Sequence, residues 1–336
     1  MTKDPLEMRE ALIALLAERL GKPLKIARIP GGQSHPVYRV DAASKTYLLR
    51  RKPDGVLLNS AHAIDREFRL LSALHPLGIP VPEPVFLHEL DEPAGTPFYV
   101  MRFVEGRTLW DPRLPELAPP DRATLQREIA ACLAQLHAVD LEAAGLADFG
   151  VRESYAARQI RRWRKQYEAD AQDIRLKPLE SLLRRLEQVP PDSGRVGIVH
   201  GDWRIDNLRI DPVAPRIAAI VDWELATLGD PVADLAYALV PYHLPHDLGP
   251  LRSMAGANYP VDCLLDADAF LNAYRDASGI DVPEIAGFLA LSFMRLAAIA
   301  WGIAGRVRRG NAVGAQADEA AGIADILARR GLDFLQ

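Results

Sequence analysis

The stretch His-Gly-Asp-Trp-Arg-Ile-Asp-Asn, residues 200–207, constrains the fold of this chain more than any other part of the sequence. An apolar run at 196–199 precedes it, and two short runs with β-branched residues follow it, Leu208–Ile210 and Ile217–Val221. Asp211-Pro212 separates the two later runs, as expected for a turn between strands. The sequence therefore predicts a polar loop that leads into a β-hairpin.

Two carboxylates and an amide lie at the base of this predicted hairpin. Asp202 and Asn207 are on the loop, and Asp222 follows the returning strand. Phosphoryl transfer from a nucleotide needs a base to orient the acceptor hydroxyl and hard oxygen ligands for Mg²⁺. The protein-kinase pattern supplies them as a catalytic-loop Asp, an Asn about five positions later and a further Asp. We therefore expect Asp202 to be the catalytic residue and Asn207 and Asp222 to hold Mg²⁺. As single residues, Asp and Asn more often serve in turns and caps.

The stretch also departs from the protein-kinase pattern. Gly201 stands where that pattern has Arg, and Trp-Glu follows Asp222 where Phe-Gly is usual. With these departures and the later run Gly-Asp-Pro-Val-Ala-Asp-Leu-Ala at 229–236, the sequence resembles the aminoglycoside phosphotransferase-like kinases, which include choline kinases. Within that superfamily it looks most similar to the kinase domains found alone or fused to acyl-CoA dehydrogenases.

This resemblance implies an α+β, two-lobed protein-kinase-like fold. We expect a small antiparallel-sheet lobe that binds the nucleotide at residues 1–103, and a mostly helical lobe with the catalytic loop and acceptor site at 104–336. Helical apolar spacing in several segments agrees with a helical second part. These segments are 121–137, 176–186, 267–277, 285–304 and 315–327.

A glycine-containing turn lies between two predicted strands near the N-terminus. Such a turn lets backbone N–H groups approach phosphates closely, although glycine turns are also common in hairpins. Its place ahead of the catalytic stretch matches the phosphate-covering loop of the resembled family. The residues that we expect to bind the cofactor there are Gly31, Gly32, Gln33 and Ser34.

The next predicted strand should carry the cation that holds the α- and β-phosphates, which is Lys in the kinase pattern. The apolar pattern places Arg50 there, and Lys52 is the alternative if the strand stays regular. Arg binds phosphate with two N–H groups and is not interchangeable with Lys. Its expected partner is Glu67, in a helix predicted over 61–74. The plainer interpretations are an exposed edge-strand charge for Arg50 and a solvated helix face for Glu67.

Residues 98–104 form a further apolar strand that ends in Glu105-Gly106. By the resemblance alone, main-chain groups of Arg102, Phe103 and Val104 should face the nucleotide base.

The acceptor site has two candidate segments. Residues 152–165 hold several Arg and Lys residues, which form either a solvated helix face or a wall that favours anionic acceptors. Residues 237–248 contain two prolines and two histidines, and we expect a loop that lines the acceptor pocket.

Composition excludes several classes of protein. The 336 residues carry a formal charge of −5, which does not favour sequence-independent nucleic-acid binding. The two isolated cysteines suit a reducing, cytoplasmic setting. Residues 1–19 lack the uninterrupted apolar core of a signal peptide. The apolar run 288–304 contains Arg295, so we expect a buried helix and no membrane partner. The sequence carries no signal for an oligomeric state.

We therefore predict an ATP- and Mg²⁺-dependent kinase that phosphorylates a hydroxyl of a small molecule. The resemblance suggests a hydroxy acid or its CoA ester as acceptor, with aminoglycoside-type or choline-type acceptors as alternatives. Arg50 in place of Lys also allows a non-catalytic nucleotide-binding module. A metal-dependent hydrolase with His200, Asp202 and Asp222 as ligands is a third interpretation, in which Asn207 and the glycine turn would have no purpose.

Overall fold

A five-stranded antiparallel sheet dominates the N-terminal part of the computed structural model, which describes residues 9–29, 36–52, 64–90, 92, 94–151, 153–171, 174–282, 284–309 and 317–336. The strand order is β1-β2-β3-β5-β4. The strands are β1 (Leu24–Arg28), β2 (Val37–Ala42), β3 (Lys45–Arg51), β4 (Pro84–His88) and β5 (Phe98–Arg102). Each strand pairs antiparallel with its neighbour.

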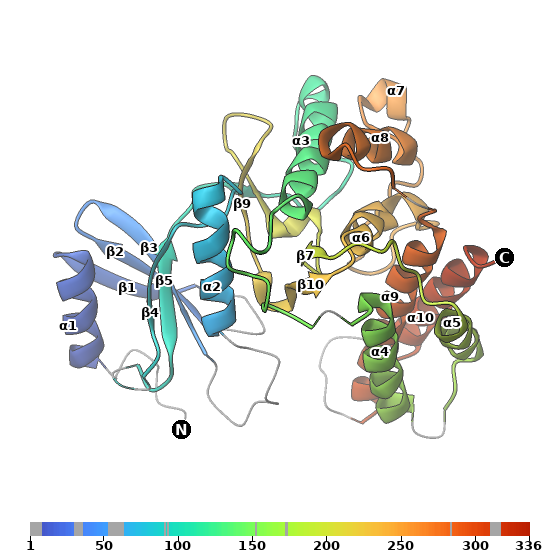
Figure 1. Cartoon of the computed structure of the whole chain (residues 1–336), viewed down its shortest axis with the longest axis horizontal. Coiled ribbons are helices and arrows are strands. Elements are labelled where there is room, and N and C mark those ends of the chain that lie inside the picture. The colour runs from blue at the N-terminus through green and yellow to red at the C-terminus, as the bar shows by residue number, and fades with distance from the viewer. Residues whose placement is uncertain are drawn as a thin grey trace.

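Two helices cover the two faces of this sheet, α1 (Arg9–Leu20) and α2 (Ile64–Leu74) (Figure 1). Because side chains alternate along a strand, Leu49 and Val100 pack on the α1 side, whereas Leu48 and Tyr99 pack on the α2 side. Arg50 shares the face of Leu48. The alternation of β3 therefore directs Arg50 toward α2 and the rest of the molecule.

The predicted hairpin after the polar loop is confirmed, with β8 (Leu208–Ile210) antiparallel to β9 (Ile217–Ile220). A short strand, β6 (Arg107–Thr108), pairs with β8, and β7 (Gly197–Val199) pairs with β10 (Thr227–Gly229). The polar loop runs from β7 to β8 and ends in a 3₁₀ turn at Ile205–Asn207. A second 3₁₀ turn, Trp223–Leu225, follows β9 and contacts α2.

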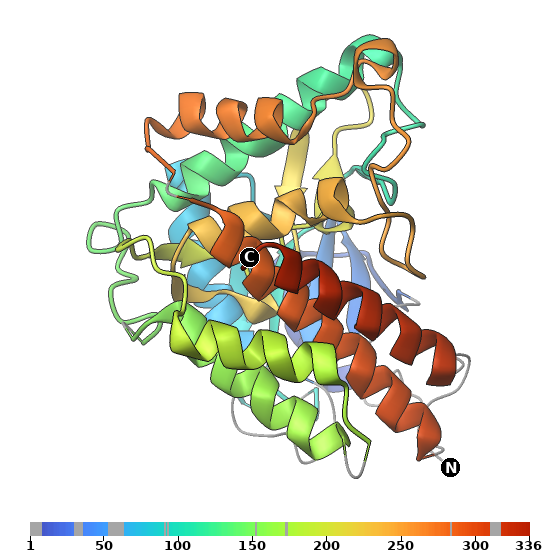
Figure 2. The same cartoon turned by 90° about the vertical axis from the view of Figure 1, so that its right-hand side faces the viewer.

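Eight helices, joined by loops, dominate the remainder of the described chain (Figures 1 and 2). They are α3 (Pro119–His137), α4 (Tyr155–Ala171), α5 (Lys177–Gln188), α6 (Val232–His243), α7 (Tyr259–Asp262), α8 (Ala267–Ser278), α9 (Ala286–Arg308) and α10 (Ala317–Asp333). The expected α+β architecture, with a small antiparallel sheet and a mostly helical remainder, is confirmed.

Helix α9 is the central helix of this part. It is apolar on all sides and packs against α4, α5, α6 and α10 (Figure 2). It is long and apolar enough to cross a membrane, but 72% of its most apolar window is buried inside the structure. The prediction of a buried helix over 285–304 is therefore confirmed.

The prediction of a loop at 237–248 is wrong for residues 237–243, because α6 continues to His243 with Pro241 inside it. Leu239 and Val240 are buried, and α6 packs on α9. This burial outweighs the helix-breaking tendency of one proline near the helix end. Residues 244–248 are outside the helix, as expected.

Candidate active site

The loop between β7 and β8 is held by a buried carboxylate from the start of α6. Asp234 accepts hydrogen bonds from the N–H of His200 at 2.5 Å and of Gly201 at 2.9 Å. Gly201 has φ +82°, and a Cβ atom there would lie 2.9 Å from the Leu225 carbonyl oxygen. Only glycine fits this conformation without strain. This close approach explains why glycine stands where the kinase pattern has arginine.

His200 is a structural part of the loop. It is fully buried, and its ring packs 4.6 Å from Trp223 between centroids. Nδ1 accepts from the Asp202 N–H at 3.2 Å, so Nε2 carries the proton and donates to the Val221 carbonyl at 3.0 Å. Both ring nitrogens are therefore occupied, which argues against His200 as the metal ligand of a hydrolase.

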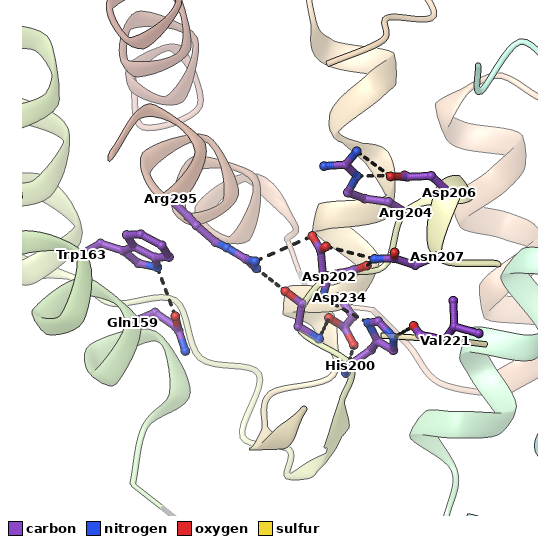
Figure 3. A network of polar contacts seen from close by, with 11 residues as sticks. Gln159, Trp163, His200, Asp202, Arg204, Asp206, Asn207, Val221, Asp234 and Arg295 are labelled. Atoms are coloured by element: carbon purple, nitrogen blue, oxygen red, sulfur yellow. Dashed lines mark hydrogen bonds and ion pairs between the residues drawn. The ribbon is translucent and has the colours of Figure 1, made fainter. Parts of the chain in front are cut away.

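The structure brings the loop and the end of β9 together. Asn207 Nδ2 donates to the Asp202 carbonyl at 2.8 Å and to Asp202 Oδ2 at 3.0 Å (Figure 3). The Val221 N–H donates to the Asn207 carbonyl at 2.9 Å, which places Asp222 next to the loop. Because the Asn207 amide nitrogen is turned to Asp202, its Oδ1 accepts no hydrogen bond from the described residues and could serve as a metal ligand.

Asp222 has an unusual backbone conformation, with φ 67° and ψ 57°. The left-handed region is energetically unfavourable for a residue with a Cβ atom, and backbone strain of this kind clusters at functional sites. Its side chain is 43% exposed, with Oδ1 3.3 Å from Arg50 Nη2. Glu224 Oε2 lies 3.4 Å from the same nitrogen. The carboxylates of Asp222 and Glu224 thus meet at Arg50, next to the loop that carries Asn207.

Arg50 joins this region to the sheet. Its Nε lies 3.2 Å from Glu67 Oε2 on α2. Burial opposes the charge on Arg50, but the carboxylates of Glu67, Asp222 and Glu224 hold its pKa above the ordinary value. Lys52 is exposed, and β3 ends before it, at Arg51. Arg50 and not Lys52 is therefore the cation that meets Glu67, and neither plainer interpretation of the pair holds.

The segment after β5 offers main-chain groups beside the sheet. The Arg102 N–H donates to the Glu83 carbonyl at 2.8 Å, and the Phe103 N–H donates to the Thr46 carbonyl at 3.0 Å. The Val104 N–H has no partner within the described residues. Among the main-chain groups at 102–104 that we expect to face the base, the Val104 N–H therefore has no bond to another described residue. The predicted phosphate loop, Gly31 to Ser34, lies outside the described residues.

One residue at this site was not singled out from the sequence as a functional candidate, Arg295 of α9. Tyr237 of α6, which lies beside it, belongs to the segment 237–248 that we expected to line the acceptor pocket. Arg295 Nη1 donates to the Gly201 carbonyl, and its Nη2 lies 3.8 Å from Asp202 Oδ1 (Figure 3). Burial raises the pKa of Tyr237 to about 12. The Arg295 charge lowers this pKa, whereas the Asp202 carboxylate raises it further. One signal was available, since Arg295 is the only charged residue in the apolar run 288–304.

A pocket of about 100 Å³ opens beside the catalytic loop. Its polar lining includes Arg204, which makes a two-point ion pair with Asp206 at 3.0 and 2.8 Å. Tyr237 also lines the pocket. Arg252 and the 66%-exposed Trp110 also line it. Most of its other walls are apolar, among them Ile129, Tyr242, Leu244, Leu251, Phe270 and Leu296.

The basic segment at 152–165 falls mainly on α4, and most of its described arginines have structural partners. Arg158 donates to backbone carbonyls, including Leu228 at 2.7 Å. Arg161 pairs with Glu153, and Arg164 pairs with Glu187. Arg162 has no carboxylate partner within the described residues, and burial together with the charge of Arg295 lowers its pKa. Arg161, Arg162 and Lys165 are exposed, as the solvated-face interpretation expects, whereas Arg158 is partly buried and has a structural role.

A small antiparallel sheet, a helical part and a polar loop that meets the end of a hairpin define a protein of the kinase-like phosphotransferase class. Comparison with known proteins agrees. The family model "Phosphotransferase enzyme family" matches residues 25–288. The chain belongs to this family.

Related proteins of known sequence or structure extend the comparison. Mouse acyl-CoA dehydrogenase family member 10 is 37% identical over 99% of this chain, which spans only 31% of that protein's length. A putative aminoglycoside phosphotransferase from Ralstonia eutropha is 34% identical, with 97% of each chain covered and a TM-score of 0.87. A spectinomycin phosphotransferase in complex with ADP and spectinomycin, 15% identical, covers 96% of this chain and 97% of its own at a TM-score of 0.61 and shares the fold.

Proposed function

We propose that this protein is an ATP- and Mg²⁺-dependent kinase that transfers the γ-phosphate to a hydroxyl group of a small molecule. The observation that carries the proposal is the convergence of Asp202, Asn207 and Asp222 from a loop and a strand end, with Arg50 reaching the same place from the sheet. The ADP complex of the spectinomycin phosphotransferase supports nucleotide use in this fold.

The residues of the chain have distinct roles in this proposal. Asp202 orients the acceptor hydroxyl and accepts its proton, while Asn207 holds the Asp202 carboxylate from the side. Arg50, positioned by Glu67, binds the phosphates with its guanidinium. The glycine turn at 31–34 covers the phosphates, and main-chain groups at 102–104 face the base. Residues 1–103 form the nucleotide lobe and 104–336 the acceptor lobe.

The donor set suits a hard divalent cation. Asn207 Oδ1 has no partner among the described residues, the Asp222 carboxylate is half-exposed, and Glu224 contacts the same Arg50 nitrogen as Asp222. Mg²⁺ prefers such oxygen ligands and usually binds through one or two carboxylates together with phosphate oxygens. When bound, it would neutralise charge on the phosphates as the bond to the γ-phosphate breaks. Arg50 must then share Asp222 with the metal.

The acceptor that we propose is a hydroxy acid or its CoA ester. The pocket beside the catalytic loop is mostly apolar, which suits a hydrocarbon chain. Arg204 and Arg252 line it, each paired with one aspartate, and Arg162 of α4 bonds neither a carboxylate nor a backbone carbonyl within the described chain. These charges favour an anion and disfavour a polycationic aminoglycoside. The relationship to an acyl-CoA dehydrogenase family member points the same way. The two free cysteines fit a reducing compartment, which we propose is the cytoplasm.

The test is ADP release by the purified protein with a panel of hydroxylated acids, CoA esters, choline and aminoglycosides. Asp202→Ala should lower kcat by about 10²–10⁴-fold. Its affinity for ATP should change little, because Asp202 touches the hydroxyl and not the nucleotide. Equal losses in turnover and ATP affinity would refute the role of Asp202. ATP affinity that depends on Mg²⁺ without turnover of any acceptor would instead identify a non-catalytic nucleotide-binding module.

A further inference from the structure

Arg295 is a charged residue in the middle of α9, a long apolar helix that is largely buried. Its side chain is 13% exposed, and its neighbours along α9, Met294 and Leu296, are buried. Placing a guanidinium in such surroundings costs several kcal/mol unless its charge and N–H groups are satisfied. The partners of Arg295 therefore indicate what the residue does.

Those partners belong to the catalytic loop and its immediate surroundings. Nη1 donates to the Gly201 carbonyl, and Nη2 lies 3.8 Å from Asp202 Oδ1. The guanidinium carbon lies 4.8 Å from the centroid of the Tyr237 ring, in cation–π geometry. Nε has no hydrogen-bond partner in the described part of the chain.

The two oxygens of Asp202 are held from two different elements. Asn207 Nδ2 binds Oδ2 at 3.0 Å, and Arg295 attracts Oδ1 from the opposite side (Figure 3). At 3.8 Å the second contact is an ion pair without a direct hydrogen bond, so Arg295 does not occupy the Oδ1 lone pair that an acceptor hydroxyl needs. The Tyr237 side chain is also within hydrogen-bond reach of the Asp202 carboxylate. Arg295 therefore restrains the carboxylate without blocking it.

We propose that Arg295 is a positioning residue, which sets the orientation of the Asp202 carboxylate from helix α9 for phosphoryl transfer. The inference rests on the proposed kinase function. It assigns Arg295 no contact with the nucleotide. A buried ion pair contributes little net stability compared with apolar side chains of similar volume. The effect of Arg295 is therefore on the geometry of the loop, and a misplaced catalytic group can lower the rate by about 10²-fold.

The test compares Arg295→Met and Arg295→Lys with a matched control, Arg308→Met. Arg308 lies on the same helix and also stacks on an aromatic ring, Trp301 at 4.7 Å, but makes no contact with the catalytic loop. We expect Arg295→Met to lower kcat by about 10²-fold with ATP affinity unchanged within about twofold, and Arg295→Lys to keep part of the rate. Arg308→Met should match the parent protein.

Chemical rescue separates positioning from a general structural effect. Methylguanidinium added to Arg295→Ala should raise kcat, and it should not raise that of the parent protein or of Arg308→Met. Full kcat in Arg295→Met, parallel loss of ATP affinity and kcat, or no rescue in a folded Arg295→Ala would each overturn the proposal.

A separate measurement distinguishes failure of this inference from failure of the kinase function. If the parent protein turns over no acceptor, the proposed function fails, and the crystal structures of the parent and Arg295→Met then decide the inference. We expect the Asp202 carboxylate to leave its position on Asn207 Nδ2 in the variant, or in Arg295→Lys if Arg295→Met does not fold. An unchanged carboxylate would overturn the positioning role.

Discussion

Arg50 on β3 and Glu67 on α2 form an ion pair with Nε and Oε2 3.2 Å apart, and their side chains are 11% and 5% exposed. The pair joins the sheet to α2, and Arg50 also forms an ion pair with Asp222 at the end of β9. One guanidinium thereby connects three elements that are distant in the sequence. Its loss should affect both stability and nucleotide binding.

Arg50→Met should destabilise the protein by about 3–5 kcal/mol, because it leaves the Glu67 carboxylate buried beside an apolar side chain. Arg50→Met/Glu67→Leu should recover much of that loss, since the double variant buries no unpaired charge. Urea unfolding of both variants measures the two free energies. A double variant no more stable than Arg50→Met would contradict this account.

Asp222→Gly and Asp222→Ala should be equally inactive but unequal in stability. Both remove the carboxylate, so both should lose the Mg²⁺ dependence of ATP binding. Glycine adopts φ 67° freely, whereas alanine keeps the strain, so the glycine variant should be more stable by about 1–2 kcal/mol. Calorimetric titration of ATP with and without Mg²⁺ and denaturant unfolding provide the measurements. Equal stabilities would show that the backbone relaxes at this position.

Gly201→Ala should lower both stability and turnover. The new Cβ atom would lie 2.9 Å from the Leu225 carbonyl oxygen, in addition to the cost of φ +82°. Gly78→Ala is the matched control, because Gly78 has φ +77° but no atom within 4 Å of its virtual Cβ atom. We expect Gly78→Ala to lower the free energy of unfolding by about 1–2 kcal/mol and to keep full kcat. Gly201→Ala should lower the free energy of unfolding by more and should also lower kcat. Unfolding free energies and kcat of the two variants provide the comparison. Similar losses in Gly201→Ala and Gly78→Ala would show that the contact with the Leu225 carbonyl has no effect.

Cys132 should not react with thiol reagents in the folded protein near pH 8. Burial raises the pKa of this thiol to about 12, so the reactive thiolate becomes abundant only near that pH. Cys263 is partly exposed and serves as the internal reference. Thiol titration should therefore detect Cys263 first, and Cys132 only after unfolding in denaturant. Rapid modification of Cys132 at pH 8 in folded protein would contradict the buried placement.

Much of the fold and part of the site followed from the sequence, because local patterns carry them. The hairpin after the polar loop, the order of Asp202, Asn207 and Asp222, and the buried helix over 285–304 all depend on short-range spacing. The loop predicted at 237–248 failed because Pro241 is a local signal, and tertiary packing of α6 on α9 outweighed it. The choice of Arg50 over Lys52 needed the end of β3 at Arg51 and the position of Glu67, because alternation alone puts residues 50 and 52 on the same face.

By itself, the sequence determined which side chains stand on the loop and at the strand end, since a hairpin returns the chain to its starting point over a short distance. Only the tertiary structure decided what surrounds Asp202. Arg295 reaches the catalytic loop from 94 residues away along the chain from Gly201, and nothing in the local spacing of either segment records that contact. The physical reason is that packing against several other helices fixes the orientation of α9 about its own axis. That orientation directs the Arg295 side chain toward Asp202.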